Sequence, residues 1–68
     1  MTHRYLLVTR YDDGRERSTR HRTVSSARER VERREAAGDR VRAALVLEDR
    51  KVVARYTRWD GWKGDEAA

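Results

Sequence analysis

One segment decides the fold: residues 41–59, VRAALVLEDRKVVARYTRW, the longest apolar part of the chain. Its β-branched and aliphatic residues favour extended backbone on both sides of Asp49-Arg50. The segment therefore predicts a β-hairpin with strands at Val41 to Glu48 and Lys51 to Trp59. A two-residue loop would place Glu48 opposite Lys51 and Leu47 opposite Val52, and this register sorts the side chains onto two faces.

One face of this hairpin is predicted to meet the core, because it is apolar throughout. Its members are Val41, Ala43, Leu45, Leu47, Val52, Ala54 and Tyr56. The opposite face carries Arg42, Ala44, Val46, Val53, Arg55 and Thr57.

The N-terminal part predicts a second hairpin. Tyr5 to Tyr11 is rich in aromatic and branched residues and is typical of a strand. Asp12-Asp13-Gly14 is a turn signal, because glycine accepts the positive φ that tight turns require. A charged edge strand from Glu16 to Val24 follows. Both faces of the first strand are apolar, so the sequence leaves open which of them points inward.

A helix is predicted between the two hairpins. Ser26 and Glu29 fit a capping box at its start, and Gly38 is suited to end it after Ala37. The expected fold is α+β: a four-stranded antiparallel sheet in β-β-α-β-β order with one helix packed on one face. We expect one small domain at residues 1–62 and a frayed tail at residues 63–68.

Two tryptophans flank a predicted turn near the C-terminal end, in Trp59-Asp60-Gly61-Trp62. Asp-Gly is a favoured two-residue turn, which would place the two indole rings opposite one another. We expect this pair to close one end of the core, and a stacking platform for bases is the alternative.

Composition argues against several classes of protein. The chain has 68 residues and no cysteine, and its two histidines, His3 and His21, are too far apart in sequence for a metal-ligand pair. We therefore expect no metal and no cofactor. No nucleophile motif or Gly-rich phosphate loop is present, so no enzyme is expected. The chain has no apolar run long enough to span a bilayer and no signal-peptide pattern, which predicts a cytoplasmic location and no membrane partner.

The positive charge lies on the predicted strands. Residues 1–23 hold six Arg against three acidic residues, and residues 40–59 hold five Arg and one Lys against two. The predicted helix region, residues 24–39, holds four of each sign. Codon usage in a GC-rich genome explains the excess of Arg over Lys, but not the net charge of +5 gathered on strands.

Nucleic acid is the first partner that this distribution suggests. Guanidinium groups bind phosphates bidentately and stay charged, so a basic sheet and first hairpin would contact the phosphate backbone without strong sequence preference. The predicted contacts are Arg15, Arg17, Arg20, Arg22, Arg42 and Arg55.

A protein partner or self-association stays open beside nucleic acid. The sheet face turned away from the helix would present an apolar strip flanked by arginines, which is typical of protein interfaces. Its predicted members are Val46 and Val53, joined by Leu6 and Val8 if Tyr5, Leu7 and Tyr11 point inward. A solvated face with scattered apolar side chains is the third alternative.

Residues 11–38 resemble the arm-type N-terminal DNA-binding domain of tyrosine integrases. The likeness rests on Asp12-Asp13-Gly14-Arg15, the basic run through Arg22, and Thr23 with Ala27. It implies DNA contact through the sheet by Arg15, Arg17, Arg20 and Arg22, although that family has three strands before its helix. The whole chain is also similar to short proteins of GC-rich actinobacteria and their phages. This likeness carries no assigned activity and implies only a bacterial or phage-infected host, in which small accessory and inhibitor proteins are common.

Overall fold

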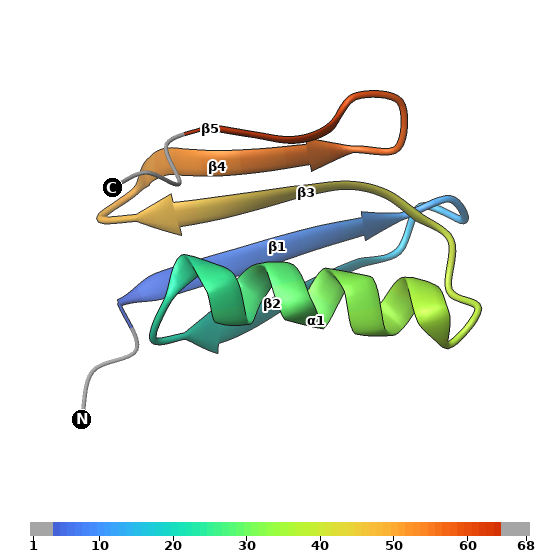
Figure 1. The fold of residues 1–68 in the computed structure, drawn as a ribbon, viewed down its shortest axis with the longest axis horizontal. Coiled ribbons are helices and arrows are strands. Elements are labelled where there is room, and N and C mark those ends of the chain that lie inside the picture. The colour runs from blue at the N-terminus through green and yellow to red at the C-terminus, as the bar shows by residue number, and fades with distance from the viewer. Residues whose placement is uncertain (1–3, 65–68) are drawn as a thin grey trace.

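The computed structural model describes residues 4–64, in which one helix lies against one face of a five-stranded antiparallel sheet (Figure 1). The strand order across the sheet is β2-β1-β3-β4-β5. The elements are β1 (Tyr5–Tyr11), β2 (Glu16–His21), α1 (Val24–Ala36), β3 (Val41–Glu48), β4 (Lys51–Thr57) and β5 (Gly61–Gly64). The α+β class and the single helix agree with the sequence analysis.

The turns of both predicted hairpins lie where expected. Asp49 and Arg50 have φ values of 52° and 68°, so a two-residue loop of left-handed residues joins β3 to β4. Gly14, at φ 90°, completes the turn between β1 and β2. β2 is an edge strand, as its charge suggested, and it is shorter than predicted because residues after His21 turn toward the helix.

The helix begins two residues before the predicted start. Thr23, not Ser26, is the N-cap, and its hydroxyl oxygen accepts a hydrogen bond of 3.0 Å from the backbone N–H of Ser26. Ser26 instead lies 3.0 Å from the His21 ring, and this contact ties the end of β2 to the first turn of α1. Gly38 follows the last turn at φ 99°, as predicted.

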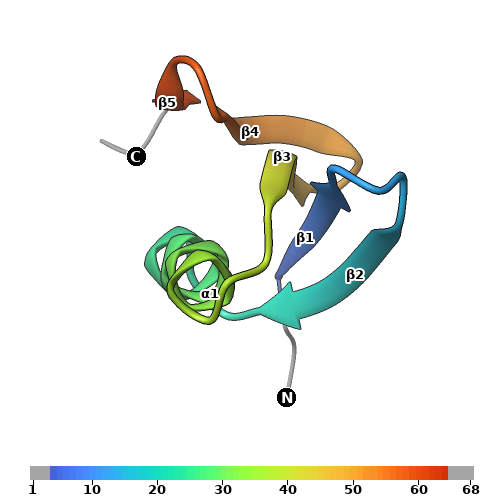
Figure 2. The ribbon, with the colours of Figure 1, turned by 90° about the vertical axis from the view of Figure 1, so that its right-hand side faces the viewer.

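The core lies between α1 and the central strands. Ala27 and Val31 are fully buried on the helix, and they face buried side chains of β1 and β3 such as Leu7 and Val46. Figure 2 shows that the sheet curls around α1, so the helix occupies the concave side and the convex side is left uncovered. The curvature brings β5 toward the helix, where the guanidinium of Arg28 lies 5.4 Å from the Trp62 ring centre.

The predicted core face of β3 is wrong. Val46 is fully buried toward the helix and Leu45 is 38% exposed on the opposite face. Two β-bulges cause the reversal. Arg10 pairs with Ala43 but Tyr11 pairs with Val41, so Arg42 is an extra residue in β3. Val41 and Ala44 therefore share the core face, and Ala43, Leu45 and Leu47 do not.

The second bulge lies in β4. Leu47 pairs with Val52 as predicted, but Val46 pairs with Ala54, which leaves Val53 as the extra residue. Ala54 and Tyr56 face the helix as expected, whereas Val52 is 51% exposed on the open side. Side chains alternate between the two faces of a strand, so one inserted residue moves every side chain beyond it to the opposite face.

The sheet has a fifth strand, β5, whereas the sequence analysis predicted four strands. Residues 58–60 form a longer turn than Asp60-Gly61 alone, and β5 pairs Trp62 with Tyr56. The Tyr56 and Trp62 rings lie 5.3 Å apart, whereas Trp59 is 70% exposed in the turn, so the predicted tryptophan pair does not form. β5 extends to Gly64, two residues past the expected domain end, and residues 65–68 of the expected tail lie outside the described residues, as does His3.

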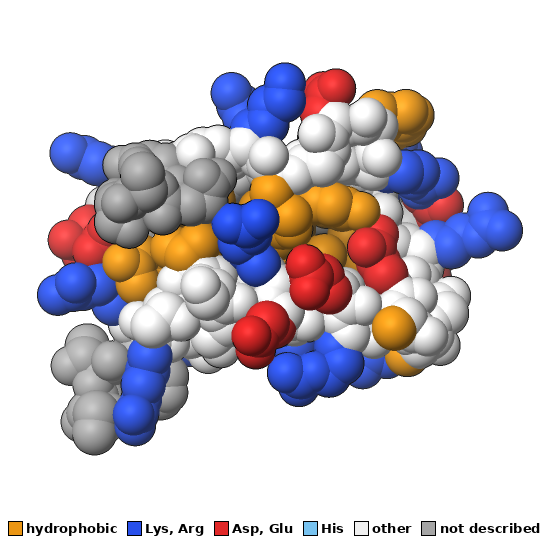
Figure 3. All heavy atoms as spheres, in the orientation of Figure 1, with side chains coloured by type: hydrophobic (Ala, Val, Ile, Leu, Met, Phe, Trp, Pro, Cys, Tyr) orange, Lys and Arg blue, Asp and Glu red, His pale blue; other side chains and the backbone are white. Residues whose placement is uncertain are grey.

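Figure 3 shows the helix side of the molecule. Apolar side chains reach the surface in a band between α1 and the outer strands, and charged side chains of both signs surround it. On this side Tyr56 donates a hydrogen bond of 2.6 Å to Glu35, which joins β4 to the helix and raises the pKa of Tyr56 to about 12.

Candidate partner-binding face

The convex side of the sheet, here called the open face, is the candidate site. The strand registers arrange its side chains in rows across the strands. The row nearest the β3–β4 turn runs Arg20, Leu6, Leu47, Val52. The next row runs Ser18, Val8, Leu45, Arg55, Lys63. Both rows have aliphatic side chains at the centre and a cation on at least one side.

The aliphatic centre of these two rows forms a continuous strip. We call it the open-face strip and define it as Leu6, Val8, Leu45, Leu47 and Val52. Leu6 and Val8 were predicted for this face on condition that Leu7 pointed inward, and Leu7 is indeed buried toward the helix. The other two predicted members lie elsewhere. Val46 is in the core, and Val53 is half-buried against it, because of the two bulges.

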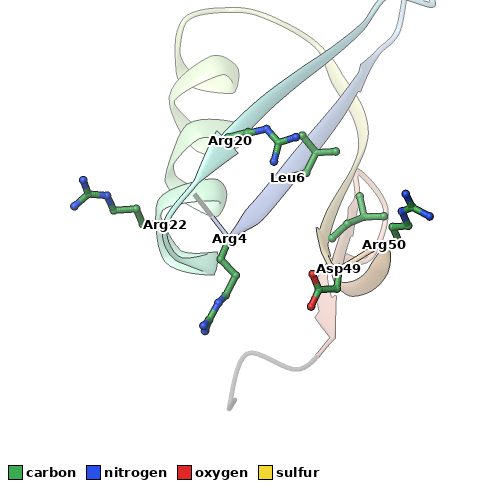
Figure 4. Close-up of a pocket in the computed structure, with 7 residues that line it drawn as sticks. Arg4, Leu6, Arg20, Arg22, Asp49 and Arg50 are labelled. Atoms are coloured by element: carbon green, nitrogen blue, oxygen red, sulfur yellow. The ribbon is translucent and has the colours of Figure 1, made fainter. Parts of the chain in front are cut away.

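Arginines surround one end of the strip. A shallow hollow of about 860 Å³ lies there, lined by Arg4, Leu6, Arg20, Arg22, Leu47, Asp49 and Arg50. Figure 4 shows Arg20 extending from β2 over Leu6, whereas Arg4, Arg22 and Arg50 spread around the rim. The hollow thus has an aliphatic floor and a border that carries four arginines and one carboxylate, that of Asp49.

Most of the cations on the open face are free of carboxylate partners. Within residues 4–64 no acidic side chain forms an ion pair with Arg20, Arg22, Arg50 or Arg55. Two other arginines are partly neutralised. Arg10 lies 2.8 Å from Glu16 across the β1–β2 pair, and Arg4 lies 3.4 Å from Glu48.

The predicted phosphate contacts divide between different parts of the molecule. Arg20 and Arg55 lie on the open face, and Arg22 lies at its border. Arg42 is the exposed bulge residue of β3 and is not the cross-strand neighbour of Arg55, which pairs with Leu45.

The two remaining predicted contacts lie toward the helix side. Arg17 pairs with the buried Thr9 and so projects to that side of β2. Arg15 is held by Asp13 at 2.6 Å and lies over the Tyr11 ring at 5.4 Å. The backbone N–H of Arg15 also donates to Asp13, and this hydrogen bond holds the pKa of Asp13 below its ordinary value.

Sequence reasoning missed five residues of the site: Arg4, Leu45, Leu47, Arg50 and Val52. A sequence signal was present for β4, because Val52-Val53 offers one more apolar residue than strict alternation needs. No such signal marks the bulge at Arg42.

The aromatic side chains do not contribute to the open face. Tyr5, Tyr11, Tyr56 and Trp62 pack against the core on the helix side, and Trp59 lies in the β4–β5 turn. The described part of the chain contains no group of three His, Asp or Glu side chains placed to hold a metal ion. It also contains no helix of the length and apolar character needed to cross a membrane.

Comparisons with family models, with curated proteins and with solved structures found no match for this chain.

Proposed function

We propose that the protein is a non-enzymatic interaction module that docks through its open face onto an acidic surface of a partner protein. The observation that carries the proposal is the open-face strip, in which Leu45 and Val52 are 38% and 51% exposed beside arginines that have no carboxylate partner among residues 4–64. An apolar centre with an arginine border is the usual anatomy of a protein interface.

The open face is several strands wide. Its two rows of side chains cross the sheet from β2 to β4, and the second row continues to Lys63 of β5. A partner protein could therefore contact side chains of several strands at once.

Charge complementarity favours an acidic partner over a second copy of the chain. In a two-fold dimer the same patch meets itself, so Arg20, Arg50 and Arg55 of one copy would face those of the other. Like charges brought together in an interface cost free energy, whereas carboxylates on a different protein would pair with these guanidiniums. Self-association is thus the less favoured use of the same strip.

The proposal is tested by placing a photo-crosslinking amino acid at position 52 and identifying the protein captured in cells. The captured protein is then purified and titrated against the wild type, Val52→Asp and Leu45→Asp. We expect each substitution to weaken binding by at least about tenfold, since a buried unpaired carboxylate opposes apolar contact.

Ser25→Asp is the matched control, because it adds the same charge at an exposed position on the helix side. Its affinity should equal that of the wild type. Equal affinities for Val52→Asp and Ser25→Asp would exclude the open face as the docking surface.

Nucleic-acid binding is the second candidate, and a specific observation favours it: the arginines around the 860 Å³ hollow include Arg20, Arg22 and Arg50, which have no carboxylate partner among the described residues. These guanidiniums would contact the phosphates of a duplex. The resemblance to integrase arm domains points the same way for Arg20 and Arg22. The aliphatic strip would then carry no phosphate contact, which is why this candidate comes second.

A titration of random duplex DNA at several salt concentrations distinguishes the two candidates. If the duplex is the ligand, Arg20→Gln with Arg22→Gln should reduce the slope of log affinity against log salt by about one unit per lost phosphate contact. Arg33→Gln with Arg40→Gln removes the same charge away from the hollow and should leave the slope unchanged. Equal slopes for all three proteins would reject Arg20 and Arg22 as phosphate ligands.

A further inference from the structure

A second basic cluster lies on the helix side of β2, separate from the open face. It surrounds a hollow of about 160 Å³ lined by Tyr11, Arg15, Arg17, Arg30, Arg34 and Asp39. These residues come from the β1–β2 hairpin, from α1 and from the loop that follows the helix. Segments distant in sequence thus bring four arginine side chains to the lining of one hollow.

The acidic side chains at this hollow satisfy only part of its positive charge. Asp39 accepts from Nε of Arg34 at 2.8 Å and lies 2.6 Å from its Nη2, so both contacts are made to one arginine. Asp13 likewise engages Arg15 at 2.6 Å. Arg17 and Arg30 have no carboxylate partner within residues 4–64.

Four arginines line this hollow with a single lining carboxylate, so their summed charge favours an anion there. The two ion pairs hold Arg15 and Arg34 in place at the border of the hollow. The volume of about 160 Å³ leaves room for a phosphate ion, whose five covalently bonded atoms occupy less space than five separate waters.

We propose that this hollow binds the phosphoryl group of a small anion, with Arg17 and Arg30 as its principal ligands. Guanidinium groups are suited to phosphate oxygens because each offers parallel N–H donors and remains charged at all physiological pH values. The paired Arg15 and Arg34 supply the surrounding positive charge. The site is independent of the open face, so it stands whether or not the proposed docking function is correct.

The experiment uses the full chain and inorganic phosphate, titrated against chloride at constant ionic strength. NMR signals of the arginine Nε–H groups report which side chains bind, and the thermal unfolding midpoint reports the linked stabilisation. We expect the Arg17 and Arg30 signals to shift with saturation and the midpoint to rise in phosphate but not in chloride.

Three double variants provide the decisive comparison. Arg17→Gln with Arg30→Gln should weaken phosphate binding at least about tenfold, because two charge-assisted contacts are lost. Arg33→Gln with Arg40→Gln removes the same charge outside the hollow and should bind phosphate as the wild type does. Arg17→Lys with Arg30→Lys keeps the charge and should bind with intermediate strength, since the forked donor geometry is lost.

Phenyl phosphate serves as a second probe, which separates esterified from free phosphate. Binding of both probes assigns the site to phosphate monoesters, and binding of inorganic phosphate alone assigns it to the free ion. The proposal is overturned if the Arg17 and Arg30 signals do not shift, or if both Gln double variants weaken binding equally, because the effect would then be one of general charge.

Discussion

Leu45 and Val46 are neighbours in sequence, and a single residue of register decides which of them enters the core. Val46 is fully buried against the helix side and Leu45 is 38% exposed on the open face. Hydrophobicity does not distinguish them, because both are aliphatic. The bulges at Arg42 and Val53 make the choice by shifting each strand against its neighbour.

This assignment predicts unequal costs of truncation at the two positions. Val46→Ala should lower the free energy of unfolding by about 2 kcal/mol, through two lost methylene equivalents and a cavity. Leu45→Ala removes more atoms but should cost less than about 1 kcal/mol, because its side chain is partly in water already. Urea denaturation of both variants checks the order, and a larger loss for Leu45→Ala would show that the register is different.

Tyr56 is the residue whose titration reports a tertiary contact. Its hydrogen bond to Glu35 raises its pKa to about 12 from 10.0, because ionisation would end the donation and place two negative charges together. A raised pKa means that the contribution to stability is fully present at neutral pH and up to 10.0, then is lost as the pH rises through about 12.

An absorbance titration of tyrosinate, with circular dichroism to follow folding, tests this contact. Glu35→Gln should return the late tyrosine step toward 10.0, and Tyr56→Phe should remove that step. Glu32→Gln is the control on the same helix. A late step that persists in Glu35→Gln would assign the raised pKa to another cause.

At the scale of the element, Thr23 defines the start of α1. Its side chain satisfies the backbone N–H of Ser26, one of the donors that every helix N-terminus leaves without an intrahelical partner. The helix is short and highly charged, and only Ala27 and Val31 are buried on it, so its ends matter to its stability.

We therefore expect Thr23→Ala to reduce the free energy of unfolding by about 1 kcal/mol. Ser25→Ala, at an exposed position in the first turn, should change it by less than about 0.5 kcal/mol. Thermal and urea unfolding measure both. If Ser26→Ala proved costly and Thr23→Ala neutral, the capping box at Ser26 would be the correct description.

β5 depends on a close backbone approach at Gly64. A Cβ atom there would lie 2.6 Å from the Ala54 Cα and 2.7 Å from the Val53 carbonyl oxygen, both backbone atoms that have little freedom to move. Gly61 also has positive φ, but a Cβ there would meet nothing within 4 Å. A side chain at either position would therefore be strained by the positive φ, but only at Gly64 would it also clash with neighbouring backbone atoms.

Gly64→Ala should accordingly detach β5 from β4, whereas Gly61→Ala should weaken the strand only through its φ of 75°. The measurement is amide hydrogen exchange of β5, together with fluorescence of Trp62, which packs on Tyr56. Similar exchange rates in the two variants would mean that the close approach does not hold the strand.

For the whole molecule, one layer of helix covers one side of a curled sheet and leaves the other side open. The open face combines the open-face strip with arginines that form no ion pair within the described part of the chain. Self-association through this face therefore depends on the balance between apolar attraction and charge repulsion. At physiological ionic strength the repulsion acts over ~8 Å, and at 1 M salt over only ~3 Å.

This balance predicts how association responds to salt. The protein should sediment as a monomer at physiological ionic strength and begin to self-associate near 1 M salt, where the strip can pair once the arginines are screened. Val52→Asp should remain monomeric at both salt concentrations, and Ser25→Asp should behave as the wild type. A stable dimer at low salt would instead make self-association the primary use of the open face.

The amino-acid sequence by itself determined the α+β class, the two hairpin turns, the edge position of β2 and the helix that joins the hairpins. These features follow from local chemistry: positive φ at Gly14, β-branched strands, and a narrow apolar stripe at Ala27 and Val31. Only the tertiary structure decided the faces of β3 and β4, the fifth strand, and the separation of Arg17 from Arg20 on opposite sides of the sheet. The physical reason is that side chains alternate along a strand with a period of two, so one bulge residue, chosen by the packing of the whole sheet, exchanges what is buried and what a partner can reach.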